Sequence, residues 1–295
     1  MNSASESISS LVHLALPKGR MEDGVLSLLR DAGIRVTFGK RGYRPTLSLQ
    51  GFETKILKPQ NIVEMLHLGS RDLGFAGADW VAEKDVELVE LLDTALDPVR
   101  VVVAALPEFA DGNLGTSGTF RIASEYPHLT EQWLKRKELD ARVVRTYGAT
   151  EVFPPEDADC IVDNTATGET LKANGLVIID EVMRSSTRLY AHPMALEQRE
   201  KRERIEHLVL LLRSVLDARL RVMLEINVPA ESVETVVAVL VPHAMGEPTM
   251  SPLHGERGFA LKAALPRQAL PSLIPEIKAR GGSDIVVTTL AQIVP

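Results

Sequence analysis

Hydrophobic and polar positions alternate along the chain in two ways. Short apolar runs that stop at a proline, a glycine or a charged residue predict buried β-strands, and apolar residues at helical spacing predict amphipathic helices. Strands are predicted at 11–16, 34–38, 46–57, 72–77 and 98–106, and helices at 23–32 and 59–69. This alternation predicts an α/β domain with a largely parallel sheet over residues 11–99.

A second block, residues 100–180, shows the same alternation. Strands are predicted at 120–126, 141–148 and 160–164. The helix between the first two is expected to be capped at Thr130, with Glu131 in its first turn. Another helix is predicted to begin after Gly168, and residues 176–193 predict a strand, a turn and a returning strand.

The pattern changes again beyond residue 193. Residues 194–218 are first charged and then strongly apolar at helical spacing, without proline or glycine, which predicts one long connecting helix. Residues 219–295 predict the order strand, helix, strand, strand, helix, strand. This βαββαβ order is that of a ferredoxin-like domain, which we expect to be a separate small unit.

Composition limits the class of protein. Of the 295 residues, 45% are hydrophobic and 25% charged, and the net charge of −7 argues against nucleic-acid binding. The single cysteine, Cys160, excludes an internal disulfide and favours a reducing, cytoplasmic location. No apolar run reaches the length of about 18 residues that a membrane span needs. Residues 1–10 lack the features of a signal peptide and are expected to form a disordered tail.

Positive charge is nevertheless concentrated near the N-terminus. Nine basic and four acidic residues lie between Lys18 and Lys58. A basic region on an acidic chain favours binding of a small polyanion, and an ordinary solvated surface is the alternative. Within it, Pro17-Lys18-Gly19-Arg20 follows a buried strand and offers a point charge and a guanidinium fork for phosphate oxygens, although a surface turn has the same sequence pattern.

The strand Cys160-Ile161-Val162 stops at an acid and a series of small hydroxylated residues. The loop is Asp163-Asn164-Thr165-Ala166-Thr167-Gly168-Glu169-Thr170, and Leu171 starts the next apolar face. Ligands in open α/β sheets bind beyond the carboxyl ends of strands, and a following helix start favours an anion. The loop therefore favours a phosphate site with Asp163 directed at ribose hydroxyls, and a plain strand–turn–helix connection is the alternative.

A third candidate lies at residues 74–80, Gly-Phe-Ala-Gly-Ala-Asp-Trp. Its small residues would allow a flat ligand to approach the backbone, and Asp79 would either read a polar edge or cap the next helix. The sequence contains no grouping of histidine, cysteine and carboxylate with zinc-ligand spacing. No residues are assigned as metal ligands.

Several motifs, in order, resemble the long form of the ATP phosphoribosyltransferase family, which begins histidine biosynthesis. They are "LALPKGR", "LKPQNIVEMLHLGSRDLGFAGADWV", "RIASEYPHLT", "DNTATGETLKANGL", "EINVP" and "PTMSPL". The resemblance implies a two-lobed catalytic core like that of periplasmic binding proteins, with lobe I at 11–99 plus a return segment at 181–218 and lobe II at 100–180. It also implies an ACT-like regulatory domain at 219–295. Asn164 departs from the loop wording usual for the family.

The implied reaction joins N1 of the adenine of ATP to C1 of the ribose of phosphoribosyl pyrophosphate and releases pyrophosphate. The adenine nitrogen carries its own lone pair, so the burden falls on positioning and on stabilising the leaving group with Mg²⁺ and cations. By the resemblance, Asp163 to Leu171 bind phosphoribosyl pyrophosphate, and Lys18 and Arg20 face phosphates as catalytic groups together with Asp163. The implied nucleotide-pocket residues are Gly77, Ala78, Asp79, Glu125, Gly148 and Glu151.

The resemblance further implies dimers that form hexamers and inhibition by histidine. Thr249 and Ser251, in "PTMSPL", are expected to hold the charged ends of histidine, and a loop that only supports assembly is the alternative. Two rival functions stay open from the residues: a two-lobed small-molecule-binding protein without catalysis, and a regulatory paralogue that has lost activity.

Overall fold

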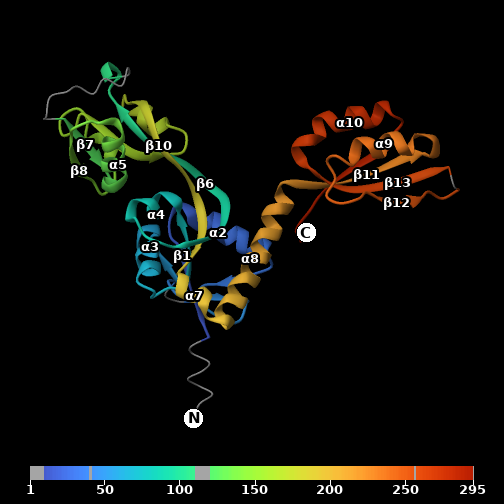
Figure 1. The fold of residues 1–295 in the computed structure, drawn as a ribbon, viewed down its shortest axis with the longest axis horizontal. Helices are drawn as coiled ribbons and strands as arrows, with labels where there is room; N and C mark the ends of the chain where they lie inside the picture. Colours follow the sequence, from blue (N-terminus) through green and yellow to red (C-terminus); the bar gives the residue numbers. More distant parts are fainter. Residues whose placement is uncertain (1–9, 40–41, 110–119, 256, 295) are drawn as a thin grey trace, which may run out of the picture. The chain divides into compact units, whose positions relative to one another are not determined.

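The computed structural model describes residues 10–39, 42–109, 120–255 and 257–294 (Figure 1). All but the last residue of the expected tail, 1–10, therefore lies outside the described part of the chain. The chain divides into two compact units. The first holds residues 1–30 and 34–207, and the second holds residues 31–33 and 208–295.

The first unit is built on one eight-stranded sheet. Its strands are β1 (Val12–Pro17), β4 (Phe52–Leu57), β5 (Leu73–Gly77), β6 (Val89–Ala105), β7 (Arg121–Ser124), β8 (Arg142–Arg145), β9 (Cys160–Thr165) and β10 (Val177–Ala191). They are ordered β4-β1-β5-β10-β6-β9-β7-β8. The pairs β4–β1, β1–β5, β9–β7 and β7–β8 are parallel, whereas β6 and β10 are antiparallel to their neighbours. The sheet is thus mixed, and parallel only toward its two edges.

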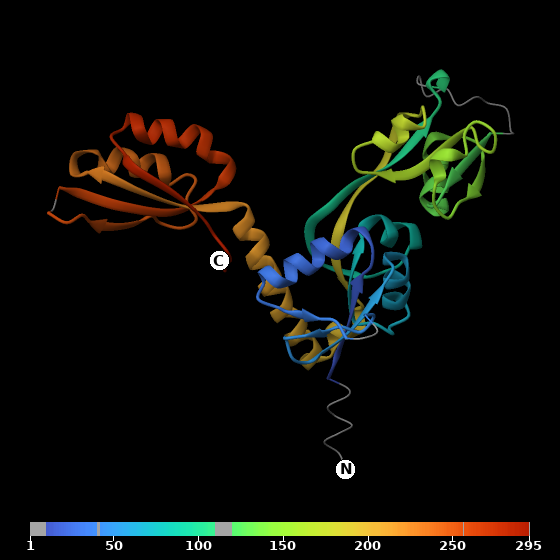
Figure 2. The same ribbon diagram turned by 180° about the vertical axis from the view of Figure 1, so that it is seen from behind.

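Two long strands join the two halves of this sheet. Strands β6 and β10 run side by side from the half that holds β1 to the half that holds β7 (Figures 1 and 2). We call the half with β1, β4 and β5 lobe I and the half with β7, β8 and β9 lobe II. The expectation of a strand, a turn and a returning strand at 176–193 is wrong. The segment forms one long strand, β10, that pairs with β6, and a shift in the pairing register near Ser185-Ser186 takes the place of the expected turn.

Helices and short elements complete the two lobes. Lobe I has α2 (Arg20–Asp31), α3 (Pro59–His67), α4 (Ala78–Lys84) and the two-stranded β2 (Val36–Thr37) and β3 (Thr46–Leu47). Lobe II has α5 (Pro127–Lys137), α6 (Glu169–Ala173) and the 3-10 turns η1 (Pro107–Phe109) and η2 (Thr150–Val152). Helix α5 begins at Pro127 instead of being capped at Thr130, since proline suits the first helical position and the Thr130 hydroxyl donates back to the Tyr126 carbonyl.

The segment after β10 forms two helices. These are α7 (Pro193–Glu197) and α8 (Arg199–Arg219). The expectation of one helix over 194–218 is therefore wrong, because Gln198 has an extended backbone (ψ 110°) that interrupts the helical hydrogen bonds. Helix α7 starts at Pro193, and the ring of His192 accepts a hydrogen bond from the Met194 amide.

The second unit has the βαββαβ order. Its elements are β11 (Arg221–Pro229), η3 (Ala230–Ser232), α9 (Val233–Leu240), β12 (Thr249–Pro252), β13 (Gly258–Pro266), η4 (Arg267–Ala269), α10 (Leu270–Ala279) and β14 (Ser283–Thr289). The antiparallel sheet is ordered β12-β13-β11-β14, and both helices cover one face (Figures 1 and 2). Alternate residues of β11, Val222, Leu224, Ile226 and Val228, are buried. The expected fold class, a two-lobed α/β core with a ferredoxin-like C-terminal domain, is confirmed.

Candidate active site in the two-lobed unit

The acid-and-hydroxyl stretch begins inside β9, since Asp163, Asn164 and Thr165 are the last residues of that strand, and continues as a turn from Ala166. Cys160, Ile161 and Val162 are fully buried between β6 and β7, and Asp163 is half-buried where the strand leaves the core. Gly168 has φ +85°, a left-handed conformation that turns the chain toward α6 and that suits glycine. The loop therefore presents the Asp163 carboxylate and exposed hydroxyls on one side of lobe II.

The loop is held by its own hydroxyls. The Thr165 hydroxyl accepts a hydrogen bond from the Gly168 amide at 2.9 Å, and the Thr167 hydroxyl accepts from the Glu169 amide at 3.4 Å. Each hydroxyl keeps its own hydrogen available for a ligand oxygen. Because α6 has only five residues, hydroxyl groups and the turn carry more of any anion binding than a helix dipole does.

Asp163 has an unusual electrostatic environment. The pKa of its carboxyl is raised from 3.8 to about 6, mainly by burial and also by the negative charges of Glu125 and Glu151, whereas hydrogen bonds from the Asn164 amide and Thr150 act in the opposite direction. The Asn164 amide lies 2.6 Å from Asp163 Oδ1. A carboxylate in this state is short of positive partners, as expected where a ligand supplies the missing donors.

A cavity of about 320 Å³ lies between elements of both lobes. Its lining residues are Lys58, Gln60, Asn61, Trp80, Lys84, Glu125, Arg145, Thr146 and Tyr147. Lys58 precedes α3, and Trp80 and Lys84 belong to α4, whereas Glu125 and Arg145 come from lobe II. The cavity combines three cations with two aromatic rings, a set that suits a ligand with phosphates and a flat ring.

Glu125 connects the cavity to the loop. Burial raises the pKa of its carboxyl, and the positive charge of Lys58 opposes that shift. Gly148 has φ +115° and faces this carboxylate, since a Cβ atom at Gly148 would lie 3.9 Å from Glu125 Oε1. Glu125 also repels Asp163, so the structure brings these two expected site residues together electrostatically, with Glu151 of η2 as a third acid.

The stretch at 74–80 occupies the start of α4. Gly77 and Ala78 are buried, and a Cβ atom at Gly77 would lie 2.1 Å from Asp79 Oδ1. Asp79 is 3% exposed, and its carboxylate accepts hydrogen bonds from Tyr126 at 2.7 Å and from Ser185 at 2.6 Å. The Asp79 oxygens are thus bonded within the protein, while the adjoining Trp80 lines the cavity.

The remaining expected residues lie elsewhere on the surface. Lys18 and Arg20 are exposed around Gly19 (φ +89°), and Lys18 Nζ lies 3.3 Å from the Tyr43 hydroxyl. Neither lines the cavity. Thr249 and Ser251 are exposed on β12, at the edge of the second unit's sheet. Within the described ranges, no group of three or more His, Cys, Asp or Glu is arranged to hold a metal ion.

Comparisons with known proteins agree along nearly the whole chain. The family described as "ATP phosphoribosyltransferase" matches residues 58–214, and "HisG, C-terminal domain" matches residues 218–292. The ATP phosphoribosyltransferase of Pelotomaculum thermopropionicum is 33% identical over 96% of this chain and 99% of its own length. That of Chlorobium phaeobacteroides is 32% identical, over 95% and 96%. The chain belongs to the ATP phosphoribosyltransferase family.

A solved structure supports the same assignment of family. It is described as "ATP phosphoribosyl transferase (HisG:HisZ) complex from Thermotoga maritima", with a TM-score of 0.62 and 27% identity over 70% of this chain and 99% of that one. The expected resemblance is therefore confirmed, and the enzyme class of the family is that of pentosyltransferases. In the described part of the chain, no helix is long and apolar enough to cross a membrane.

Within this ATP phosphoribosyltransferase fold, several residues of the cavity were not expected from the sequence. Trp80, Lys84, Arg145 and Tyr147 line it beside Lys58, and Arg145 lies over the Tyr147 ring at 5.4 Å. They come from two separate segments, helix α4 and the end of β8 with the residues after it. Two signals in the sequence lay near this cavity: the charge excess that ends at Lys58 and the candidate stretch 74–80 that ends at Trp80.

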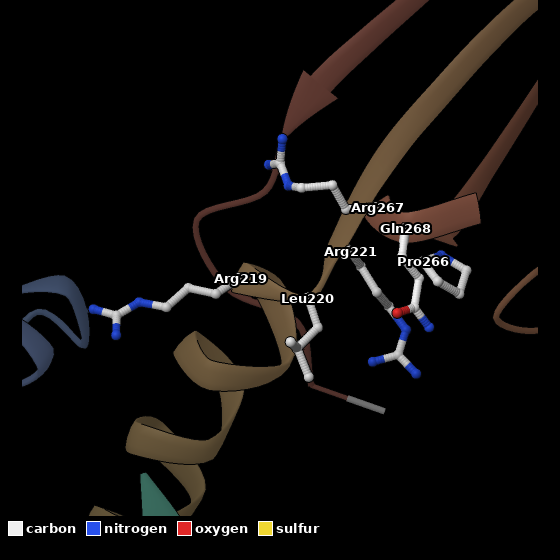
Figure 3. Close-up of a pocket in the computed structure, with 6 residues that line it drawn as sticks. All are labelled: Arg219, Leu220, Arg221, Pro266, Arg267 and Gln268. Atoms are coloured by element: carbon white, nitrogen blue, oxygen red, sulfur yellow. The ribbon is translucent and has the colours of Figure 1, made fainter. Parts of the chain in front are cut away.

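A second cavity, of about 610 Å³, lies in the C-terminal unit (Figure 3). It is lined by Arg219, Leu220, Arg221, Pro266, Arg267 and Gln268. The three guanidinium groups point in different directions, and that of Arg219 pairs with Asp31 at 2.8 Å (Figure 3). They do not converge on a common point, so this cavity lacks the arrangement of a single-anion site.

Proposed function

We propose that this chain transfers the phosphoribosyl group of phosphoribosyl pyrophosphate to N1 of the adenine of ATP, the first step of histidine biosynthesis. The observation that carries the proposal is the carboxyl end of β9, where the half-buried acid Asp163 precedes a turn with hydroxyl side chains in a chain of this family. Asp163 accepts hydrogen bonds from the ribose hydroxyls, and the hydroxyls of Thr165, Thr167 and Thr170 donate to the 5-phosphate. Ala166, Gly168, Glu169 and Leu171 provide the turn and its anchor.

The cavity beside this loop is the proposed place of ATP. Lys58, Lys84 and Arg145 neutralise phosphate charge, and Trp80 and Tyr147 offer faces for the adenine ring. Glu125, Gly148 and Glu151 line the approach to Asp163, and Gly77, Ala78 and Asp79 support the wall that carries Trp80. Lys18 and Arg20 remain proposed phosphate contacts, since they are exposed cations beside a glycine turn.

These groups suggest a mechanism by positioning. The adenine nitrogen needs no general base, so the protein holds N1 in line with C1 and excludes competing orientations. Asp163 also lies where positive charge develops on the ribose, which an ionised carboxylate stabilises. Cations of the cavity counter the negative charge of the departing pyrophosphate.

The acids of this site suit a magnesium ion that is held by few protein ligands. Magnesium keeps several waters and is usually held by one or two carboxylates and by substrate phosphates. Asp163 and Glu125, two acids without a guanidinium partner in the described chain, are the carboxylates that would hold it. When bound, Mg²⁺ neutralises charge on the leaving pyrophosphate.

Regulation by histidine is the further part of the proposal. Thr249 and Ser251 are exposed on the edge strand β12, where a second copy of the domain can pair and an amino acid can bind at the junction. Histidine would inhibit by binding one arrangement of the subunits more tightly than another. We propose dimers that assemble into hexamers, and a cytoplasmic location follows from the pathway.

Pyrophosphate release tests the main reaction. The full-length protein, mixed with ATP, phosphoribosyl pyrophosphate and Mg²⁺, is expected to release pyrophosphate only when both substrates are present. A binding protein or an inactive regulatory paralogue would bind one substrate in calorimetry and release none. Release without ATP would indicate simple hydrolysis and contradict the proposed transfer.

Truncation tests the regulation. A chain that ends at Ala218 is expected to keep part of its activity, to lose inhibition by histidine and to change its size in solution. Thr249→Ala and Ser251→Ala in the full chain are the matched variants, because they leave the domain in place. Equal inhibition by histidine in the truncated and full-length chains would place the effector site in the catalytic core.

A further inference from the structure

A buried tyrosine lies between the loop of lobe II and the first turn of α4 in lobe I. Tyr126 is fully buried and precedes α5, and its ring stacks on Trp80 with 4.7 Å between centroids. The Glu83 carboxylate accepts hydrogen bonds from the His128 and Leu129 amides at 3.2 and 3.0 Å. The start of α5 is therefore fixed against α4, and the phenol has little freedom to move.

The phenol oxygen has two polar partners. Its hydroxyl lies 2.7 Å from Asp79 Oδ2, and the Asn164 side-chain nitrogen lies 2.8 Å from the same oxygen. An ionised carboxylate only accepts, so the phenol donates to Asp79 and accepts from the Asn164 amide group. Burial and the charge of Asp79 raise the pKa of Tyr126, which keeps the phenol protonated for this role.

The chain of contacts continues in both directions. Asp79 Oδ1 accepts from the Ser185 hydroxyl at 2.6 Å, and the same hydroxyl accepts from the Asp79 amide at 3.0 Å. At the other end, the backbone amide of Asn164 donates to Asp163 Oδ1 at 2.6 Å. The contacts thus run from Ser185 on β10, through Asp79 and Tyr126, to Asn164 and the carboxylate expected to meet the ribose.

We propose that Tyr126 and Asp79 are positioning residues for phosphoribosyl pyrophosphate: they hold the Asn164 side chain and thereby fix the orientation of Asp163. This inference rests on the proposed function of the loop. It changes the expected role of Asp79, whose oxygens are bonded to Tyr126 and Ser185 and act on the substrate through the loop. The adenine site then depends on Trp80, the neighbour of Asp79.

The physical reason is preorganisation. Asp163 and Asn164 lie in the last half of β9, paired with Val102 and Val101 of β6. The sheet therefore fixes their backbone, and the orientation of the Asp163 carboxylate depends on the groups that contact it. The Asn164 side-chain nitrogen lies 3.4 Å from Asp163 Oδ1, so an Asn164 side chain held by Tyr126 limits rotation of the carboxylate. A carboxylate held in the binding geometry loses less entropy when the ribose hydroxyls arrive.

Tyr126→Phe tests the inference, because it removes one oxygen and keeps the ring that stacks on Trp80. We expect the KM for phosphoribosyl pyrophosphate, and its dissociation constant in calorimetry, to rise by about tenfold. The reason is that the variant loses the charge-assisted hydrogen bond to Asp79 that helps to order Asn164. The KM for ATP is expected to stay within about twofold. Tyr190→Phe is the control, since Tyr190 is a buried tyrosine on β10 in the lobe I core, away from the loop.

A purely structural role for Tyr126 would lower kcat and thermal stability and leave the KM ratio of the two substrates unchanged, which would overturn the inference. A double variant, Tyr126→Phe with Asn164→Leu, supplies a second check. If the phenol acts through Asn164, the double variant loses no more affinity than Asn164→Leu alone, and additive losses contradict the inference. If Tyr126→Phe does not fold, Ser185→Ala and Asn164→Leu probe the two ends of the same chain of contacts.

Failure of this inference is separable from failure of the proposed function. If the unaltered protein releases pyrophosphate and Tyr126→Phe has the same two KM values, the phosphoribosyl transfer is supported and the positioning role of Tyr126 is refuted. If the unaltered protein binds no phosphoribosyl pyrophosphate, the function itself is refuted.

Discussion

Lys201 Nζ lies 2.8 Å from Asp72 Oδ1, and both side chains are about nine-tenths buried. The other oxygen of Asp72 accepts a hydrogen bond from the His13 amide at 2.7 Å. One carboxylate thus links β1, the start of β5 and the first turn of α8. A buried pair of this kind fixes the geometry of the elements it joins, because either charge left alone would be strongly disfavoured.

We expect Lys201→Met to lower the free energy of unfolding by about 3–5 kcal/mol, since it leaves the Asp72 carboxylate buried and unpaired. The double change Lys201→Met with Asp72→Asn should be less harmful than Lys201→Met alone. Arg199→Met is the control, because Arg199 pairs with Glu203 at an exposed site on the same helix and should cost about 0.5 kcal/mol or less. Urea denaturation of the full chain measures all three, and equal losses in Lys201→Met and Arg199→Met would contradict the burial argument.

Binding of phosphoribosyl pyrophosphate should depend on the ionisation of Asp163. The folded-state pKa is about 6, so the carboxylate that accepts from the ribose is present above pH 6 and is lost below it. We expect affinity to fall by up to tenfold per pH unit below about pH 6. Calorimetry from pH 5 to 8 measures this fall, and the same series with Asp163→Asn accounts for the phosphate groups of the ligand, which also titrate near pH 6.

Glu125→Gln should change the pH at which binding of phosphoribosyl pyrophosphate is half lost. The Glu125 charge raises the pKa of Asp163, so its removal should shift the midpoint of binding to lower pH. Asp157→Asn is a suitable control, because Asp157 is an exposed acid of lobe II that is absent from the groups acting on Asp163. An unchanged midpoint in Glu125→Gln would contradict the role of the Glu125 charge and leave burial and Glu151 as the causes of the raised pKa.

Asp163 should also reduce the stability of the fold. Its carboxyl has a higher pKa in the folded chain, about 6, than its ordinary value of 3.8. Below pH 3.8 both states are protonated and the penalty is absent; it grows as pH rises from 3.8 to 6 and is complete above that, at about 3 kcal/mol. Asp163→Asn should therefore raise the melting temperature at pH 8 and leave it nearly unchanged at pH 4.

Arg20 distinguishes the phosphate role from a plain surface turn. Arg20→Lys keeps the charge and loses the planar fork, so kcat/KM should fall several-fold, and Arg20→Ala should be worse. Arg30→Ala, at the exposed end of the same helix, is the matched control. Near-normal turnover of Arg20→Ala with intact melting behaviour would assign Arg20 to the solvated surface.

The parts of the site that could be predicted from the sequence are those encoded in consecutive residues. The strand predicted at 160–164 is β9 (Cys160–Thr165), and the predicted turn follows it with Gly168 in a left-handed conformation. The cavity could not be predicted in this way, because Trp80, Arg145 and Tyr147 line it together only in the folded sheet, whose strand order is not the order along the chain. Periodicity contains no information about which separate segments become neighbours.

The errors in the predicted elements have a similar cause. Residues 176–193 contain polar Ser185-Ser186, which suggests a turn, but the long partner strand β6 keeps the chain extended. Helix α5 starts at Pro127 because the Glu83 carboxylate of another helix receives its first free amides. A local pattern at Thr130 and Glu131 could not reveal that distant acceptor.

The order in which the strands of the sheet occur along the chain affects synthesis and folding. Lobe II contains β7, β8 and β9 in one continuous stretch, whereas lobe I needs β10, whose Ala191 pairs with Leu73. During synthesis, β5 therefore keeps an unpaired edge until the last residues of β10 have left the ribosome. By then the strands of lobe II have already been synthesised. Contacts between residues so distant in sequence form slowly, and an exposed edge invites pairing with other chains. The N-terminal lobe should thus be the last part of this unit to fold and the part most dependent on protection during synthesis.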